Sequence, residues 1–233
     1  MHHDVLMIDD EEPLAASTTE YLASFDVRST YVTTAEAALD LLATDTATVL
    51  LLDINLPGMS GFELCRRVRA TSDASIVFLS ARGSDDDQVH ALTIGGDDYV
   101  RKPFSLAVLL AKVRRILDRR TGPTPQGTSG ADAGYADDHL RVDAATGRVH
   151  VAGAEVSLTA MEDRLLRHLV ANRGRVVPKA ELLEQVWGST FTGESTLSVH
   201  VRRLRTKIEP DADAPTYVRT VWGRGYLFEG RTP

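Results

Sequence analysis

Residues 51–61 read LLDINLPGMSG, an apolar run that ends in an aspartate and then breaks at Pro57 and Gly58. With the two residues before the quoted stretch, the run reads VLLLD (49–53) and is apolar at every position before the aspartate. This is typical of a strand buried on both faces of a parallel sheet. Helical patterns separate it from other runs of strand length, and this alternation predicts a doubly wound α/β domain with a five-stranded parallel sheet over residues 1–120. The other runs are VLMI (5–8), SIVFLS (75–80) and the weaker DVRSTYV (26–32) and DYVR (98–101).

The composition is that of a globular protein. The chain has 233 residues, of which 43 % are hydrophobic and 25 % charged, enough for two packed cores. No stretch approaches the roughly 18 uninterrupted apolar residues of a membrane span, and the first residues do not resemble a secretion signal. We therefore expect a cytoplasmic protein. The single cysteine, Cys65, falls on an apolar position of a helical pattern, so we interpret it as a core residue.

A change in composition divides the chain. Residues 121–135 (TGPTPQGTSGADAGY) carry no periodic apolar signal and predict a flexible linker. Beyond it, short β-like segments are followed by helical patterns at 159–172, 178–187 and 194–208 and by two short strands around Gly223 and Gly225. A small sheet, three helices and a terminal hairpin indicate a winged-helix domain over residues 136–233.

The net charge of −7 is unevenly distributed. Residues 1–121 carry 12 basic and 19 acidic side chains, whereas residues 122–233 carry 14 of each. Within the second half, residues 195–208 contain four cations and no acid. An acidic protein overall can therefore still offer a local basic surface to a nucleic acid.

Carboxylates follow two of the predicted strands. Asp9, Asp10 and Glu11 come after the first run, and Asp53 ends the central one. If these strands are neighbours, the acids converge, and their mutual repulsion favours a hard divalent cation such as Mg²⁺. The alternative is that acids at strand ends merely cap helices or face solvent.

A lysine and a hydroxyl are predicted at the same edge of the sheet. Lys102 follows the last run in DDYVRKPF, and Pro103 restricts it to an extended conformation and allows a cis peptide. Ser80 ends the run at 75–80. Acids, a hydroxyl and a lysine together are the parts of a phosphoryl-transfer site.

These residues carry a resemblance to a known family. The motifs MIDDEE, LLDINLPGMSGFELCRRVR, FLSAR and GGDDYVRKPF resemble, in order and spacing, a response-regulator receiver domain with the flavodoxin-like fold. The segments SLTAMEDRLLRHLVANRGRVVPKAELLEQVW, ESTLSVHVRRLRTKIE and YVRTVWGRGYLF resemble the winged-helix DNA-binding domain of the OmpR/PhoB family. The resemblance covers nearly all of the chain except the linker.

The resemblance implies roles for the receiver residues. Asp53 would accept a phosphoryl group from a sensor histidine kinase, and Mg²⁺ would be bound by Asp9, Asp10, Asp53 and the carbonyl of Asn55. Slow autodephosphorylation would be the only other reaction. Tyr99 matches an aromatic switch residue, although a half-buried strand tyrosine is the plain alternative. The residues implied to contact the phosphoryl group or to switch with it are Ser80, Ala81, Tyr99 and Lys102.

The family commonly forms homodimers through the last part of the receiver domain. The resemblance assigns this face to Asp97, Asp98, Lys112 and Arg119. Gln88 and Val108 stand where relatives usually have a base and an acid, so one ion pair is lost. Exposed pairs contribute only about 0–1 kcal/mol, so dimerisation can survive this change with altered partner choice.

In the second domain, the third helix resembles a recognition helix that enters the major groove of promoter DNA. RNA polymerase is a further implied partner. Two departures reduce the number of cations, because Ser195 and Trp222 stand where relatives often have Arg. Trp222 could contact the minor groove or pack on the hairpin. The residues implied to contact double-stranded DNA are Thr196, His200, Arg202, Arg203, Arg205, Arg219, Thr220 and Arg224.

Two other functions compete with a phosphorylation-controlled transcription regulator. A Mg²⁺-dependent phosphohydrolase could use Asp53 as its nucleophile, but it usually needs a second acid just after it, and Asn55 stands there. A regulator with an inactive site would be controlled by protein contacts alone. The intact set of acids, hydroxyl and lysine argues against this third interpretation.

Overall fold

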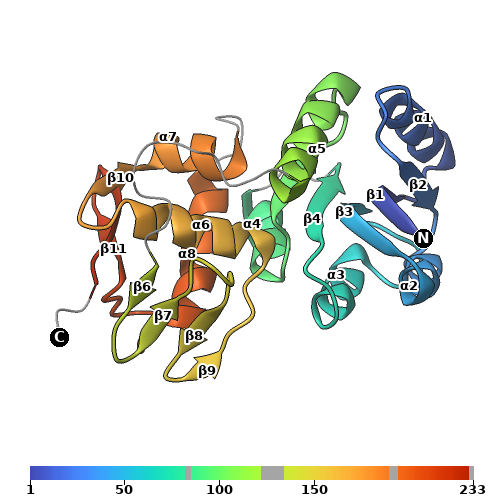
Figure 1. Ribbon diagram of the computed structural model, residues 1–233. Helices are drawn as coiled ribbons and strands as arrows, with labels where there is room; N and C mark the ends of the chain where they lie inside the picture. Colours follow the sequence, from blue (N-terminus) through green and yellow to red (C-terminus); the bar gives the residue numbers. More distant parts are fainter. Residues whose placement is uncertain (82–84, 122–133, 189–193, 231–233) are drawn as a thin grey trace. The chain divides into compact units, whose positions relative to one another are not determined.

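The computed structural model describes residues 1–81, 85–121, 134–188 and 194–230, except for the side chains of residues 85, 86 and 119–121. The chain divides into two compact units, Met1–Thr121 and Gly122–Pro233 (Figure 1). A helix ends at Thr121, and the next described strand begins at Tyr135. The predicted linker at 121–135 therefore lies for the most part outside the described residues.

The first unit is built on a parallel sheet with the strand order β2-β1-β3-β4-β5 (Figure 1). All five predicted runs form strands, and the predicted doubly wound α/β fold is confirmed. The strands are β1 (His2–Ile8), β2 (Ser29–Val32), β3 (Thr46–Asp53), β4 (Ser75–Ser80) and β5 (Asp98–Arg101). The helices are α1 (Glu12–Ala23), α2 (Ala35–Thr44), α3 (Gly61–Arg69), α4 (Asp85–Thr93) and α5 (Leu106–Thr121).

Successive residues of β3 enter two different hydrophobic cores. Leu50 and Leu52 pack with side chains of α2, α3 and α4, and Cys65 of α3 belongs to this core. Val49 and Leu51 pack on the opposite face with α1 and α5. Because a strand sends alternate side chains to opposite faces, only a run that is apolar at every position fills both cores.

The second unit contains two small antiparallel sheets and a cluster of helices, in agreement with the predicted winged-helix order. The sheets have the strand orders β6-β7-β8-β9 and β10-β12-β11. The strands are β6 (Tyr135–Ala136), β7 (Leu140–Val142), β8 (Val149–Val151), β9 (Ala154–Glu155), β10 (Val176–Pro178), β11 (Val218–Val221) and β12 (Gly225–Phe228). The helices are α6 (Ala160–Ala171), α7 (Lys179–Leu182) with its π-helical continuation η1 (Leu183–Trp187), and α8 (Glu194–Ile208).

α6 begins with a capping box whose acid, Glu162, is fully buried. The Thr159 side chain accepts from the amide of Glu162, and the Glu162 carboxylate accepts from the amide of Thr159. Leu165 and Leu169 of α6 then share one core with Leu204 of α8.

Among the described residues, no helix has both the length and the apolar character needed to cross a membrane.

Candidate functional site

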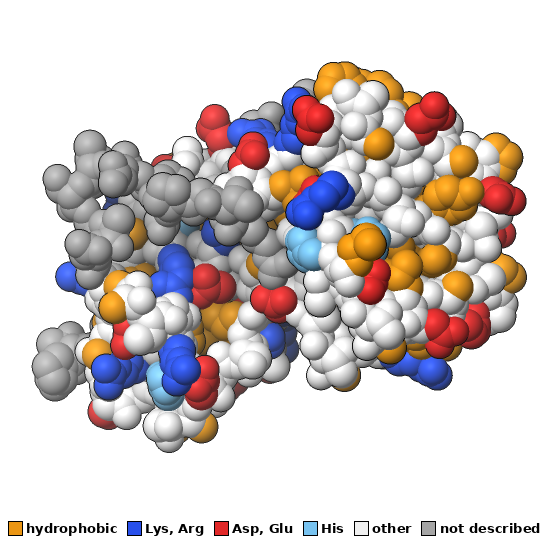
Figure 2. Space-filling model, turned by 45° about the vertical axis from the view of Figure 1, so that its right-hand side comes forward, with side chains coloured by type: hydrophobic (Ala, Val, Ile, Leu, Met, Phe, Trp, Pro, Cys, Tyr) orange, Lys and Arg blue, Asp and Glu red, His pale blue; other side chains and the backbone are white. Residues whose placement is uncertain are grey.

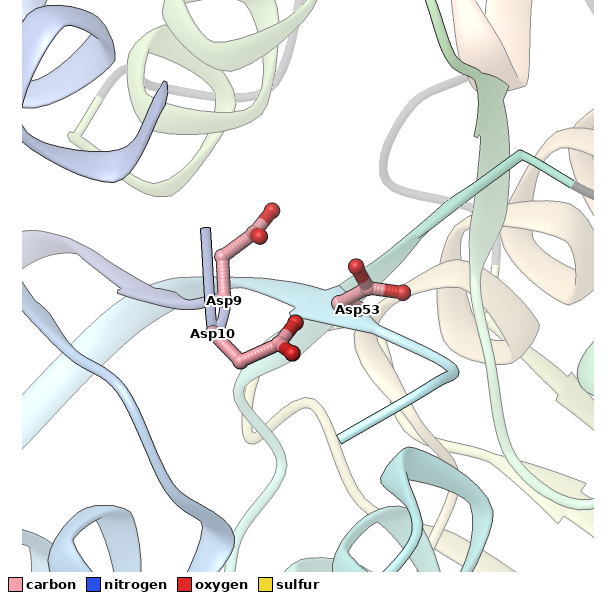
Figure 3. Close-up of side chains that lie close together, drawn as sticks. All are labelled: Asp9, Asp10 and Asp53. Carbon is pink, nitrogen blue, oxygen red and sulfur yellow. The ribbon is translucent and has the colours of Figure 1, made fainter. Parts of the chain in front are cut away.

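Three carboxylates converge at the carboxyl edge of the parallel sheet. Asp9 and Asp10 directly follow β1, and Asp53 is the last residue of β3. These strands are neighbours, with Ile8 paired to Leu52, and oxygen atoms of the three side chains lie within 4.8 Å of one another (Figure 3). The order of the strands reverses between β1 and β3, and doubly wound sheets bind ligands at such a point.

The backbone around these acids fixes their orientation. Asp53 Oδ1 accepts a hydrogen bond of 2.9 Å from the amide of Asn55, and Asp9 Oδ1 accepts one of 3.1 Å from the amide of Glu11. The loop after β3 returns close to the strand, so that a Cβ on Gly61 would lie 2.0 Å from the carbonyl oxygen of Asp53. Only glycine fits there, at the start of α3.

Lys102 lies just beyond β5 and brings a positive charge to the cluster. Its Nζ lies 2.6 Å from Asp53 Oδ2, 2.9 Å from Asp9 Oδ2 and 2.9 Å from Glu11 Oε1. The side chains of Lys102 and Asp53 are only 9 % and 6 % exposed, so the pair lies in a poorly hydrated environment. The peptide bond between Lys102 and Pro103 is cis.

The electrostatics of the cluster suit a cation. Burial raises the pKa of Asp9 above its usual value, because lost hydration outweighs the hydrogen bond and charge of Lys102. Burial alone would lower the pKa of Lys102, but its hydrogen bonds to the three acids raise it above the usual value. Asp9 Oδ2 is buried and accepts no well-directed hydrogen bond, although the ammonium lies 2.9 Å away. An under-coordinated oxygen beside two more carboxylates fits the donor set that Mg²⁺ prefers.

The remaining predicted receiver residues lie at the same edge or near it. Ser80 is fully buried at the end of β4, the strand next to β3, and Ala81 follows it and is exposed. Tyr99 of β5 is half-buried and packs against the core that contains Leu52. This position of Tyr99 fits both the switch role and the plain strand tyrosine.

Two of the predicted DNA contacts lie inside the second unit. Thr196 and His200 are fully buried, and the His200 ring packs edge to face on Trp187 with ring centroids 5.1 Å apart. They lie on a stripe of α8 beside the one formed by Leu197 and Val201, and both stripes face the core. The prediction that Thr196 and His200 contact DNA is therefore corrected, since both are core residues.

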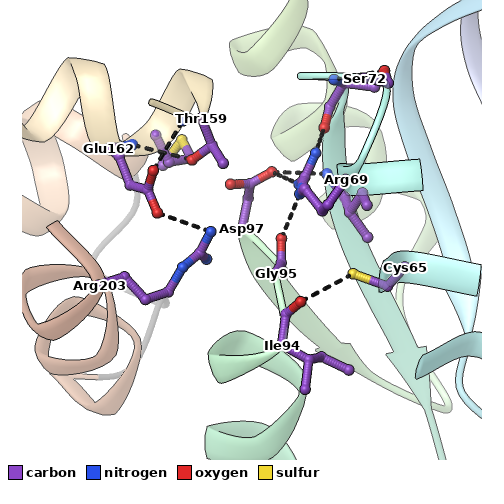
Figure 4. A network of polar contacts seen from close by, with 12 residues as sticks. Cys65, Arg69, Ser72, Ile94, Gly95, Asp97, Thr159, Glu162 and Arg203 are labelled. Carbon is purple, nitrogen blue, oxygen red and sulfur yellow. Dashed lines mark hydrogen bonds and ion pairs between the residues drawn. The ribbon is translucent and has the colours of Figure 1, made fainter. Parts of the chain in front are cut away.

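Further predicted DNA contacts hold the domain together. Arg203 Nη2 lies 2.9 Å from Oε1 of the fully buried Glu162 (Figure 4). Lys207, which was not among the predicted contacts, places its Nζ 2.6 Å from Oε2 of the same residue. The Arg205 guanidinium donates to the Val218 carbonyl oxygen (2.8 Å) and to Thr220 Oγ1 (2.9 Å). These cations of α8 brace it against α6 and β11.

Other charged side chains of this unit face solvent. Arg202 of α8 is exposed and forms an ion pair with Asp213. Arg219 and Arg224, before and after the tip of the β11–β12 hairpin, are also exposed. On the face shown in Figure 2, charged side chains stand singly or in small groups among hydrophobic and polar ones.

The exposed side of α8 also includes residues that the sequence prediction missed. Ser198 is exposed and Val199 is half-exposed, and they precede Arg202 by four and three positions. This is the spacing of one helix face. Their position on that face was therefore readable from the sequence once Arg202 was taken as its centre.

Comparison with known proteins places both units in one family. A family model for the response regulator receiver domain matches residues 5–114, and one described as transcriptional regulatory protein, C terminal, matches residues 153–228. Sensory transduction protein RegX3 of Mycobacterium tuberculosis is 40 % identical over 227 residues, which cover 97 % of this chain and 99 % of the relative. This chain is a response regulator of the OmpR/PhoB family.

Two further proteins are similar to this response regulator over nearly all of its length. Response regulator MprA of Mycolicibacterium vanbaalenii is 36 % identical over 231 residues, which cover 98 % of each chain. The crystal structure of DrrB from Thermotoga maritima, described as an OmpR/PhoB homologue, has a TM-score of 0.52 and 30 % identity, with 99 % of this chain and 100 % of that chain covered. The function of the protein is thus that of a two-component, DNA-binding transcriptional regulator.

In this response regulator, one residue predicted for the dimer face is internal. Asp97 is 2 % exposed, and its Oδ2 lies 2.6 Å from Arg69 Nη2 and accepts a hydrogen bond of 2.9 Å from the Ile76 amide (Figure 4). The Asp97 carboxylate thus joins α3 to the β4 and β5 strands. Its assignment to the dimer face is corrected accordingly.

The other residues of the predicted dimer face are placed differently. Asp98 forms an ion pair with Lys112 within the receiver domain, and the side chain of Arg119 lies outside the described residues. Gln88 is half-buried, and the Val108 side chain is 52 % exposed on α5. Their contribution to a dimer stays a prediction.

Proposed function

We propose that this response regulator accepts a phosphoryl group on Asp53 from the phosphohistidine of a sensor kinase. The proposal rests on one observation: the Lys102 ammonium lies 2.6 Å from Asp53, with Asp9 and Asp10 beside it. An Asp53 oxygen attacks phosphorus, the P–O bond forms as the P–N bond to the kinase histidine breaks, and the imidazole nitrogen leaves with the bonding electrons. Hydrolysis by water slowly returns Asp53 to the free carboxylate.

The ligands of a metal ion are also part of the proposal. Asp9, Asp10, Asp53 and the backbone carbonyl of Asn55 would hold Mg²⁺, which supplies positive charge against the oxygens of the phosphoryl group. Lys102 would release Asp9 and Glu11 and pair with the phosphoryl group. Ser80 would donate its hydroxyl to it, the Ala81 amide would contact it, and Tyr99 would turn inward.

The output we propose is a homodimer that binds promoter DNA and engages RNA polymerase in the cytoplasm. In the receiver domain Asp98, Lys112 and Arg119 would contribute to the dimer. In the effector domain the exposed side of α8, centred on Arg202, would enter the major groove, and Arg219, Thr220 and Arg224 would contact DNA beside it. Arg203 and Arg205 would act chiefly by holding α8 in place.

The intact mass of the protein after incubation with Mg²⁺ and acetyl phosphate tests the phosphoacceptor. The wild type should gain one phosphoryl group that is stable in acid and labile in base, as an acyl phosphate is, and Asp53→Ala should gain none. Asp40→Ala, which removes an exposed carboxylate from α2, should behave like the wild type. A phosphoryl gain in Asp53→Ala, or none in the wild type with either acetyl phosphate or a phosphorylated kinase, would contradict the proposal.

A further inference from the structure

The tip of the β11–β12 hairpin carries an unusually exposed aromatic side chain. Trp222 is 89 % exposed, whereas Val108 and Phe25, two other large hydrophobic residues at the surface, are 52 % and 38 % exposed. Trp222 follows β11 directly, and the tight turn after it is closed by a hydrogen bond of 3.0 Å from the Arg224 amide to the Val221 carbonyl. Trp222 therefore projects into solvent rather than packing on the hairpin.

The hairpin that carries Trp222 is held firmly against α8. The Arg205 guanidinium binds the Val218 carbonyl and Thr220 Oγ1, and it lies over the Tyr226 ring with 6.0 Å from Cζ to the ring centroid. On the other side, β12 is pressed on β10, since a Cβ on Gly225 would lie 2.0 Å from the Val177 carbonyl oxygen. The hairpin that carries Trp222 is thus held beside the helix proposed to enter the major groove.

The cations close to Trp222 in the sequence favour a phosphate-bearing partner. Residues 214–228 contain two cations, Arg219 and Arg224, and no acid. Both side chains are exposed, although Arg219 also pairs with Glu229. An exposed apolar ring with arginines on both sides of it in the sequence is suited to a surface that offers phosphates beside flat, apolar base pairs.

We propose that Trp222 is a wedge that inserts its indole between base pairs in the minor groove next to the groove that α8 enters. The inference rests on the proposed DNA-binding function and specifies a residue that determines sequence preference. Because Arg205 ties the hairpin to α8, a helix seated in the major groove would bring the hairpin to the adjoining backbone and minor groove. An inserted ring must unstack one base step, and pyrimidine–purine steps unstack at the lowest cost. Trp222 therefore selects such a step outside the bases that α8 contacts.

Fluorescence of the full chain gives the first test, because the protein has only two tryptophans. Trp187 is 6 % exposed, so a neutral quencher such as acrylamide should act mainly on Trp222, and Trp222→Phe identifies its signal. The DNA probe is a duplex selected by the acetyl-phosphate-treated wild type from a random-sequence pool. On binding, the Trp222 emission should be quenched by base stacking and become protected from acrylamide.

Variants at position 222 give the second test. Trp222→Ala should weaken binding to the selected duplex roughly tenfold without changing the slope of affinity against salt, because the lost contact is uncharged. Trp222→Phe should retain most of the affinity. Trp222→Arg should steepen that slope by about 0.9 for one added phosphate contact, and its selected sequences should lose the preference for a pyrimidine–purine step. Arg148→Ala, which removes an exposed cation directly before β8, should change none of these quantities.

The outcomes separate this inference from the function on which it rests. Equal affinity and equal sequence preference for Trp222→Ala and the wild type would overturn the wedge while DNA binding stands. Protection of Trp222 on phosphorylation without DNA would overturn it in favour of an interface between copies. Failure of the phosphorylated wild type to select any duplex would overturn the DNA-binding function and the wedge together.

Discussion

The Arg203 guanidinium lies 2.9 Å from the carboxylate of Glu162, which is fully buried beneath α8 (Figure 4). The second oxygen of Glu162 accepts hydrogen bonds from Lys207 Nζ (2.6 Å) and from the Thr159 amide (2.9 Å). Burial alone would raise the pKa of Glu162, but the charges of Arg203 and Lys207 lower it below the usual value. Two cations of the proposed recognition helix are therefore held by an acid at the start of α6.

This pair predicts a difference between two adjacent arginines. Arg203→Ala should destabilise the effector domain by about 2 kcal/mol, since it leaves a buried carboxylate with one cation fewer. Arg202→Ala should change stability by less than about 1 kcal/mol, since its pair with Asp213 is exposed. Urea unfolding followed by tryptophan fluorescence measures this, because both tryptophans lie in the effector unit.

DNA affinity should follow the opposite order among the molecules that remain folded. Arg202→Ala should weaken binding and reduce the salt slope by about 1 unit. Arg203→Ala should leave the salt slope nearly unchanged under conditions where the domain is folded. If Arg203→Ala were as stable as the wild type and lost a phosphate contact, then Arg203 would be a DNA-binding residue, as the sequence had suggested.

Helix α8 shows which features of the fold could not be predicted from the sequence. The strands could be predicted because β3 is apolar at every position, and the acid cluster could be predicted because strand ends of one parallel sheet meet at one edge. The burial of His200 could not be predicted. His200 and Thr196 form a polar stripe beside Leu197 and Val201, and in the sequence such a stripe looks like the solvent face of an amphipathic helix. Only the packing of α6 and of Trp187 against α8 shows that the buried face is wider than its apolar residues.

Asp97 illustrates the same limit in the receiver domain. The motif GGDDY matches the family in sequence, but it does not reveal that the first of its two acids turns inward. Arg69 of α3 provides the partner, at 2.6 Å, from a position 28 residues earlier. The last turn of α3 contains three arginines. The sequence does not show which of them contacts a buried acid, because that depends on the rotation of the helix about its axis.

The cluster of Asp9, Asp10 and Asp53 predicts that Mg²⁺ can replace the stabilising charge of Lys102. Lys102→Ala removes the ammonium that lies between Asp9 and Asp53, and breaking such a buried pair costs about 3 kcal/mol. Without Mg²⁺ the receiver domain should therefore unfold at lower urea, and millimolar Mg²⁺ should restore most of the loss by neutralising the same acids. Far-UV circular dichroism reports the unfolding of both units. Tryptophan fluorescence reports the effector unit alone, so the part of the dichroism change that it does not follow belongs to the receiver domain.

A matched variant tests whether this rescue is specific. Lys112→Ala also breaks a poorly exposed ion pair, with Asp98, but it leaves a single acid away from the cluster. Mg²⁺ should not restore its stability. Equal rescue of both variants would point to a general salt effect, and no rescue of Lys102→Ala would count against a metal site formed by Asp9, Asp10 and Asp53. Lys102→Ala should still accept a phosphoryl group slowly but should not dimerise in response.

Asp137 gives the effector domain a predictable response to acid. Its Oδ2 accepts hydrogen bonds from the Tyr135 hydroxyl (2.6 Å) and the Tyr217 hydroxyl (2.8 Å), and its Oδ1 accepts from the amides of His139 (2.8 Å) and Leu140 (2.7 Å). Burial alone would raise the pKa of Asp137, but these four hydrogen bonds lower it to about 2. The carboxylate thereby connects the strand region around β6 and β7 to Tyr217 beside β11.

Because the folded-state pKa is below the usual value of 3.8, the unfolded chain binds the proton more readily. The stabilisation is therefore fully present above about pH 4 and is lost as the pH falls towards about 2. Asp137→Asn should lower the free energy of unfolding by about 2 kcal/mol at neutral pH, and its difference from the wild type should shrink steadily below pH 4. Asp138→Asn, at the exposed neighbouring position, should follow the wild type throughout. A difference between Asp137→Asn and the wild type that is the same at pH 7 and pH 3 would show that the ionised carboxylate is not the source of the stabilisation.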